Sequence, residues 1–185
     1  MKGQFWTGTV IWNRDADYYN SGAWRGKWDT EGGGVLINQS LHTLDLLIHF
    51  IGEPSTITSV TSNITLKDVI EVEDTAFIKA SGGANFTFFA TNASTIDFPI
   101  KVSLLLDNER IELQDQKVII GNTEYKFDDL KYYGKGCYGN GHKNLISAFY
   151  DAVINDKNFP VDGKEASKVI KLILSVYEQS ELKRK

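Results

Sequence analysis

The chain contains 185 residues, of which 42% are hydrophobic and 24% charged, and its formal net charge is −4. This length is sufficient for one domain with its own hydrophobic core, and the composition excludes a disordered chain. The acidic balance, with no basic run longer than Lys183-Arg184-Lys185, argues against nucleic acid or an anionic membrane as a partner.

Cys137 is the single cysteine, which excludes an internal disulfide framework. No apolar run has the length of a membrane span, and no signal-peptide pattern is present. These features together lead us to expect a cytoplasmic protein.

The first third of the chain predicts a strand, a long loop and a helix. Residues 4–12 alternate and are rich in β-formers, which predicts a strand. Residues 13–30 are polar and aromatic with no period, which predicts a loop of the kind that usually carries function. Gly32-Gly33-Gly34 then allow the backbone to turn sharply into a helix over 34–51, which Gly52-Glu53-Pro54 end.

Four polar residues share one face of that predicted helix. Asn38, His42, Asp45 and His49 are spaced four, three and four apart, which places them on one stripe at about 100° per residue. The rest of the helix is almost wholly apolar, as in a buried helix. Because burying an amide, an imidazole and a carboxylate without partners costs free energy, a buried polar stripe predicts a functional site.

From residue 56 the pattern changes to strands. Gly82-Gly83 and Asp107-Asn108 mark hairpin turns, so the sheet should be largely antiparallel. We expect strands over 56–67, 72–80, 85–91, 100–106, 110–113 and 118–120, and a short edge strand at 125–127.

A second glycine- and tyrosine-rich loop is expected over 131–141, followed by two helices over 143–154 and 163–182. A strand, a helix, a run of strands and then helices indicate an α+β fold with helices packed on one face of one sheet. Apolar residues on both faces of some strands indicate that the other face is covered by an oligomer interface or a missing domain.

Several short motifs occur in one order over nearly the whole chain. They are Tyr18-Tyr19, Trp24-Arg25-Gly26, Gly32-Gly33-Gly34, Asn38-Gln39, His42, Asp45, Val72-Glu73-Asp74, Gly141-His142 and Pro160-Val161-Asp162-Gly163. Together they resemble the C-terminal domain of the Gfo/Idh/MocA oxidoreductases. The tryptophan-arginine-glycine and asparagine-glutamine motifs are most similar to dehydrogenases of sugars and nucleotide-linked amino-sugar acids.

This resemblance implies an open, largely antiparallel mixed sheet like that of the glyceraldehyde-3-phosphate dehydrogenase C-terminal domain, whose face often builds dimers or tetramers. It implies a sugar or nucleotide-sugar substrate and, in the full enzyme, an N-terminal Rossmann domain that binds NAD or NADP. His42 would act at the substrate hydroxyl with a lysine from that domain's glutamate-lysine-proline motif. The position of Asn38 is often aspartate in the family, so Asn38 would position the hydroxyl by hydrogen bonding.

Neither a Gly-x-Gly-x-x-Gly after a strand nor a glutamate-lysine-proline motif occurs here. We therefore expect the chain alone to bind no dinucleotide, and to be the substrate-binding and oligomerisation part of a dehydrogenase that is inactive without its Rossmann domain. The alternative is a free-standing, non-catalytic module that binds a sugar or pairs with another protein.

Each candidate on the helix also has a structural alternative. His42 could be a hydrogen-bonded core histidine instead of a general acid–base, and Asn38 a buried amide satisfied by backbone. Asp45 could orient the imidazole or bond the backbone of a neighbouring loop. We expect Asp45 and the glycine triplet Gly32-Gly33-Gly34 to support the structure of the site. A metal site is not expected, because no second cluster completes a coordination shell.

The remaining candidates lie in loops. Arg25 could bind a carboxylate or phosphate, or pair with Asp29 or Glu31. Glu73-Asp74 are expected to be a structural charge pair. Further candidates for substrate binding are Trp24, Tyr19, Gln39 and His142. The two aromatic residues could instead pack in the core, and His142 could instead belong to a helix cap.

Overall fold

The computed structural model describes residues 5–182 except 84, 107, 115–116, 127–140 and 160. Within this part of the chain, eight strands form one open sheet in the order β2-β3-β4-β1-β5-β6-β7-β8. The parallel pair is β1 with β4, and all other neighbours are antiparallel. The strands are β1 Phe5–Ile11, β2 Thr56–Ser62, β3 Thr75–Ser81, β4 Phe86–Thr91, β5 Lys101–Leu105, β6 Arg110–Gln114, β7 Lys117–Ile120 and β8 Thr123–Lys126.

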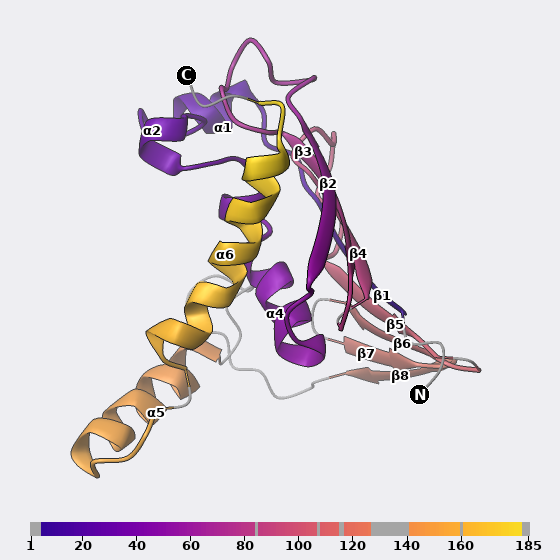
Figure 1. Cartoon of the computed structure of the whole chain (residues 1–185), viewed down its shortest axis with the longest axis vertical. Helices are drawn as coiled ribbons and strands as arrows, with labels where there is room; N and C mark the ends of the chain where they lie inside the picture. Colours follow the sequence, from indigo (N-terminus) through magenta and orange to yellow (C-terminus); the bar gives the residue numbers. More distant parts are fainter. Residues whose placement is uncertain are drawn as a thin grey trace.

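The helices lie on one side of this sheet, which confirms the predicted α+β fold (Figure 1). The long helices α4 and α6 pack on each other and against the strands, while α1 and α2 lie near one end of the sheet. The helices are α1 Ala16–Asn20, α2 Trp28–Glu31, α3 Val35–Asn38, α4 Leu41–Ile51, α5 Gly141–Ile154 and α6 Gly163–Gln179.

The core lies between the sheet and these two helices. Ala76, Ile78 and Ala80 alternate with exposed or half-buried residues along β3, as expected for a strand with one covered face. Gly8 allows a helix to approach β1 closely, since a Cβ there would lie 2.8 Å from Leu47 of α4 and 2.7 Å from Phe88. The alternating pattern thus directs one face of each central strand into the core.

The opposite face of the sheet is covered by no helix in the described part of the chain (Figure 1). Val60 pairs with Phe77, which in turn pairs with Phe89, so a short apolar row crosses three strands of this face. Val60 and Phe77 are exposed. Cover of this face by an oligomer interface or a further domain stays a prediction.

Two expectations near the N-terminus are wrong. The predicted loop over 13–30 contains the short helices α1 and α2, and Asp15 caps α1 by accepting from Tyr18 N at 2.9 Å. The predicted helix over 34–51 is two helices, because Ser40 N bonds back to the carbonyl of Val35 at 2.9 Å and the next helix starts at Leu41.

The strands are found where the pattern predicts them, with two shorter than expected. β2 ends at Ser62 and β3 begins only at Thr75. Between them, one carboxylate oxygen of Asp74 accepts from the backbone N–H groups of residues 64, 65 and 66 at 2.8–3.1 Å. These N–H groups bond to the buried Asp74 side chain instead of to a neighbouring strand, so the segment forms a turn and does not extend β2. Most of the predicted loop over 131–141 lies outside the described residues, and α5 begins at Gly141.

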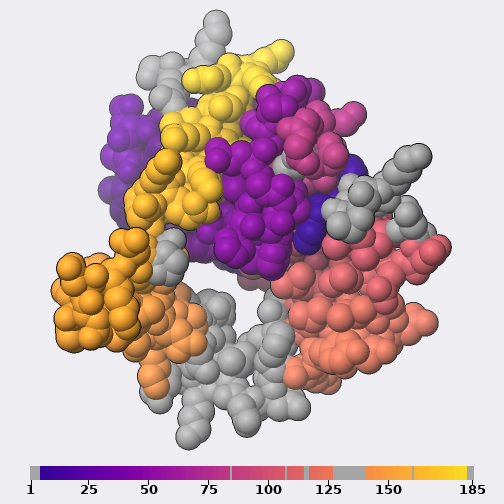
Figure 2. All heavy atoms as spheres, turned by 60° about the horizontal axis from the view of Figure 1, so that its bottom comes forward, coloured from indigo at the N-terminus to yellow at the C-terminus, as the bar shows by residue number. Residues whose placement is uncertain are grey.

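Helix α5 projects away from the rest of the molecule (Figure 1). In the space-filling view of Figure 2 it lies to one side and the strands β6–β8 to the other. Its large apolar side chains are exposed: Leu145, Ile146, Phe149, Tyr150, Val153 and Ile154. None of the helices in the described ranges is long and apolar enough to cross a bilayer.

Candidate functional site

Residues of α1, α2, α3 and the end of β4 form a polar and aromatic cluster at one end of the sheet. Its innermost members are Tyr19, Gln39 and Asn92, with exposed fractions of 4%, 5% and 1%. The Asn92 amide nitrogen donates to the Tyr19 hydroxyl at 2.8 Å and to Gln39 Oε1 at 2.9 Å. Burial raises the pKa of the Tyr19 phenol above its ordinary value, so it stays protonated.

Tyr19 and Gln39 were expected to bind substrate. In the structure the Tyr19 hydroxyl and Gln39 Oε1 both accept hydrogen bonds from the buried Asn92 amide. Their burial ties α1 and α3 to the sheet, which gives them a supporting position in this structure. Direct contact of either residue with a substrate stays a prediction.

Arg25 lies nearer the surface, half-buried between aromatic rings. Its guanidinium carbon is 4.2 Å from the ring centroid of Tyr18 and 4.5 Å from that of Trp24, and it donates to the Tyr18 hydroxyl. The expected alternative, an ion pair with Asp29 or Glu31, is not formed among the described residues. Two rings therefore hold a cation whose charge no described carboxylate neutralises.

Asn38 joins this cluster through a carboxylate. Its amide nitrogen donates to Oε1 of Glu31, and the other carboxylate oxygen of Glu31 accepts from the backbone N–H of Gly26. Since Gly26 follows Arg25 in the chain, Glu31 brings Asn38 and Arg25 to one place.

The glycine triplet is explained by a buried glutamate. Glu73, fully buried, accepts from Gly34 N at 2.9 Å, from Leu36 N at 3.0 Å and from the hydroxyl of Tyr177 at 2.8 Å. A Cβ on Gly34 would lie 1.9 Å from the Glu73 carbonyl oxygen, and a Cβ on Gly33 would lie 2.1 Å from the Tyr177 hydroxyl oxygen. Gly32 ends α2 in the left-handed region at φ 83°. The triplet thus permits close packing of α3 on β3 and α6.

Burial raises the pKa of Glu73 to about 7, against the lowering effect of the bonds from Leu36, Tyr177 and Gly34. Glu73 and Asp74 have the structural role expected of them, and each carboxylate accepts from the backbone of a different segment.

The expected burial of the polar stripe is also wrong. His42, Asp45 and His49 lie on the exposed face of α4, whose opposite face buries Leu44 and Leu47. Because α3 and α4 are separate helices, Asn38 does not continue that stripe. Exposed polar side chains remain hydrated, so keeping them on this helix costs no desolvation free energy. The argument from the cost of burying polar groups therefore does not support a site on α4.

The structure also separates two other candidates from the cluster. No hydrogen bond in the described residues joins Asp45 to His42 or to a loop. His142 lies in the first turn of α5, a helix that is set apart from α1 and α2 (Figure 1). Substrate contact by His142 stays a prediction that this arrangement does not support.

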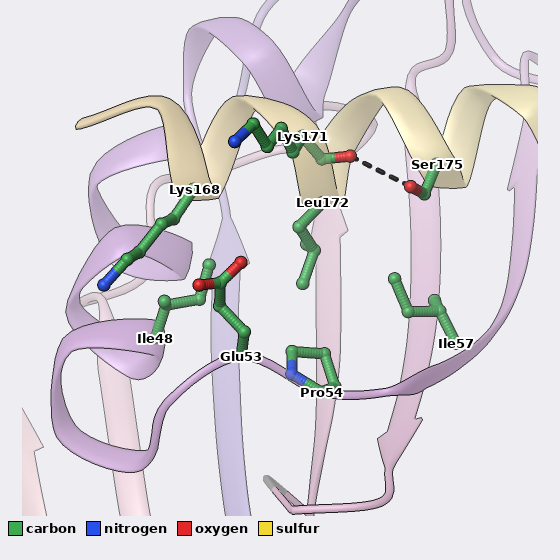
Figure 3. A pocket seen from close by; sticks show the side chains of 8 residues that line it. All are labelled: Ile48, Glu53, Pro54, Ile57, Lys168, Lys171, Leu172 and Ser175. Atoms are coloured by element: carbon green, nitrogen blue, oxygen red, sulfur yellow. Dashed lines mark hydrogen bonds between the residues drawn. The ribbon is translucent and has the colours of Figure 1, made fainter. Parts of the chain in front are cut away.

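A shallow pocket of about 120 Å³ lies elsewhere, between the end of α4, β2 and α6 (Figure 3). Its floor is apolar, and its rim carries Glu53, Lys168 and Lys171. None of the predicted site residues lines it, so it does not change the assignment of the cluster as the candidate site.

Two members of the cluster were missed by the sequence analysis. Asn92 directly follows β4, and Glu31 was considered only as a partner for Arg25. A polar residue immediately after a buried strand was the available signal for Asn92. Nothing in the local sequence indicated that Glu31 would meet Asn38 across the glycine triplet.

Solved structures with the same fold are dehydrogenases of sugars. The WlbA dehydrogenase of Bordetella pertussis, in complex with NADH and UDP-GlcNAcA, has a TM-score of 0.72 at 24% identity, over 95% of this chain and 51% of that one. Levoglucosan dehydrogenase, in complex with NADH and levoglucosan, has a TM-score of 0.74 at 18% identity, over 95% and 56%. UDP-N-acetylglucosamine 3-dehydrogenase GnnA of Acidithiobacillus ferrooxidans has a TM-score of 0.66 at 14% identity, over 97% and 54%.

The chain therefore spans about half the length of these structures, and at such identities the likeness shows the fold. No curated protein matches the sequence. A family model does match it over residues 3–111, which is more than half of the chain, and its description is the GFO/IDH/MocA C-terminal domain. With the eight-stranded sheet and the order of its motifs, this match shows that the chain belongs to the GFO/IDH/MocA C-terminal domain family.

Proposed function

We propose that this chain is the substrate-binding and oligomerisation domain of an NAD(P)-dependent sugar or nucleotide-sugar dehydrogenase, and that it is inactive without a dinucleotide-binding domain. The observation that carries this proposal is the environment of Arg25. Its half-buried guanidinium is stacked on Tyr18 and Trp24 and has no carboxylate partner among the described residues. A cation held in this way is prepared to bind an anion.

Arg25 would bind the acidic part of the substrate, a carboxylate or a phosphate. Its planar fork can contact two oxygens of such a group at once, and the two rings restrict its rotation before the substrate arrives. Trp24, which is 46% exposed, offers a ring face to the sugar or base. This pairing favours a nucleotide sugar or sugar acid over a neutral sugar.

His42 would act as general acid–base at the substrate hydroxyl, and Asn38 on α3 would position that hydroxyl by hydrogen bonding. Imidazole titrates near neutrality and can accept the hydroxyl proton when the alcohol is oxidised. The exposed position of His42 on α4 leaves its ring accessible to a substrate or to another domain.

A dinucleotide does not fit the glycine triplet of this chain. A phosphate-binding turn needs free backbone N–H groups at a helix N-terminus. Here the Glu73 carboxylate already accepts from Gly34 and Leu36. The oxygen atoms of Glu73 and Tyr177 fill the space beside the glycines. The cofactor would have to be held by a different domain.

The test is calorimetric titration of the purified chain with UDP-GlcNAcA and, in a separate assay, incubation with both NAD and UDP-GlcNAcA to detect NADH. We expect saturable binding of the sugar nucleotide, loss of about tenfold or more in affinity for Arg25→Ala, and no NADH. Arg110→Ala removes an equivalent guanidinium from β6, far along the sheet, and should leave the affinity unchanged.

Equal affinities of the wild-type chain and Arg25→Ala would refute the assignment of the anion site. NADH formation by the chain alone would refute its inactivity. Absence of any binding would favour a protein-pairing module over a substrate domain.

A further inference from the structure

Glu31 has a role in the cluster that its position at the end of α2 does not suggest. Both oxygens of its carboxylate are engaged: Oε1 accepts from the amide nitrogen of Asn38, and Oε2 accepts from the backbone N–H of Gly26. Glu31 forms no ion pair with a lysine or arginine in the described residues. Its charge is therefore held by these two N–H donors.

The chemistry of this contact determines which way the Asn38 amide faces. An ionised carboxylate can only accept hydrogen bonds, whereas an amide carries a donor side and an acceptor side. The nitrogen of Asn38 must therefore face Glu31, and because the amide is planar, Oδ1 points away from it. Among the residues that the structure describes, none donates to Oδ1.

We propose that Glu31 is a positioning residue that fixes the amide of Asn38 so that a carbonyl oxygen, and not an NH₂ group, is presented to the substrate. This role rests on the proposed function, in which Asn38 lies beside the reacting hydroxyl. An oxygen acceptor is complementary to an alcohol, which can donate its proton, and not to a ketone, which cannot. Asn38 then accepts as an aspartate would, without placing a second negative charge next to Glu31.

An exchange of the two side chains tests this contact. Asn38→Asp alone places two carboxylates in contact and should lower the melting temperature of the chain. The double variant Glu31→Gln with Asn38→Asp restores a donor opposite an acceptor, with one negative charge and nearly the same shapes. We expect the double variant to recover most of the melting temperature that Asn38→Asp loses.

Binding of UDP-GlcNAcA provides the second measurement. Glu31→Gln leaves the amide of Asn38 free to face either way, since glutamine can both donate and accept, so we expect an affinity about fivefold to tenfold below that of the wild-type chain. The double variant presents a carboxylate oxygen in the same place and should bind close to the wild-type affinity. Glu71→Gln, which removes an exposed carboxylate near α2, is the matched control and should change nothing.

The outcomes separate this inference from the proposed function. If the wild-type chain binds the sugar nucleotide but the double variant recovers neither melting temperature nor affinity, the role of Glu31 is overturned and the substrate site stands. If the double variant recovers its melting temperature but no variant binds the nucleotide, the proposed function is overturned, and with it the role of Glu31 toward a substrate.

Discussion

At the scale of single residues, two buried carboxylates order the segments around the candidate site. Glu73 holds the start of α3 and the hydroxyl of Tyr177, and Asp74 holds the turn that follows β2. The two residues are adjacent just before β3, yet their carboxylates reach different segments of the chain. Glu73 satisfies buried backbone N–H groups at the start of α3, and Asp74 satisfies those of the turn over residues 64–66.

The raised pKa of Glu73, about 7, predicts a pH dependence of stability. Between its ordinary value of 4.5 and about 7, the folded chain keeps a proton that the unfolded chain has released. The free energy of unfolding should therefore fall as pH rises through this window, by up to about 3 kcal/mol, and level off above it.

Urea unfolding of the wild-type chain and of Glu73→Gln at pH 5, 6, 7 and 8 measures this effect. The glutamine variant has no titrating group at this position, so its stability should change less over the same range. Parallel curves for the two proteins would show that Glu73 does not titrate in this window.

At the scale of elements, the sequence predicts the strands well and the first helix poorly. Alternation identifies the covered face of β3 from its residues alone, because Ala76, Ile78 and Ala80 all face the same core. The break between α3 and α4 has a weaker signal: Ser40 is of a type that favours N-caps and is the N-cap of α4, but the apolar residues on both sides of it read as one helix. The end of β2 coincides with the turn that the Asp74 carboxylate binds, a contact that strand alternation does not indicate.

In the candidate site, too, some residues could be predicted from the sequence and others could not. Arg25 and Asn38 could be selected from the sequence through their motifs, but the partners that orient them could not. Tyr18 and Glu31 meet these residues only after two short helices and a glycine turn have formed. The exposure of His42 was also unpredictable, because an apolar sequence around it suggested burial on every side.

The close approach of α3 to β3 predicts the cost of a single methyl group. Gly34→Ala would place its Cβ 1.9 Å from a backbone oxygen of Glu73, so α3 must move and its bonds to the carboxylate must lengthen. We expect the free energy of unfolding to fall by about 3 kcal/mol in chemical denaturation.

Gly163→Ala is the matched control, since no heavy atom lies within 4 Å of its added Cβ in the first residue of α6. Its stability should stay within about 0.5 kcal/mol of the wild type, with helix propensity favouring alanine. A Gly34→Ala variant as stable as this control would contradict the packing described for the triplet.

At the scale of the whole molecule, no helix among the described residues covers the second face of the sheet. We propose that a second copy of the chain covers it, as the family resemblance implies. The apolar row of Val60, Phe77 and Phe89 is the part of this face best suited to burial. Phe77→Lys should weaken self-association by about tenfold or more in sedimentation velocity, because a buried unpaired charge is costly.

Ile154→Lys adds the same charge to the exposed face of α5, where the wild-type side chain is 78% exposed. It should leave the sedimentation coefficient unchanged if the sheet is the interface. Dissociation by Ile154→Lys and not by Phe77→Lys would move the interface to α5, and melting curves verify that both variants are folded.

The parallel pairing of β1 has a consequence for how the protein is made. Among the described strands of this sheet β1 is synthesised first, yet it lies inside the sheet, where Trp6 pairs with Phe86 and Phe5 with Leu105. Its two neighbours are synthesised roughly 80 and 100 residues later, so both edges of β1 stay unpaired while α1–α4 and the β2–β3 hairpin form. Nascent chains that stall between β4 and β5 would carry β1 with one open edge, a template for aggregation that completion of β5 removes.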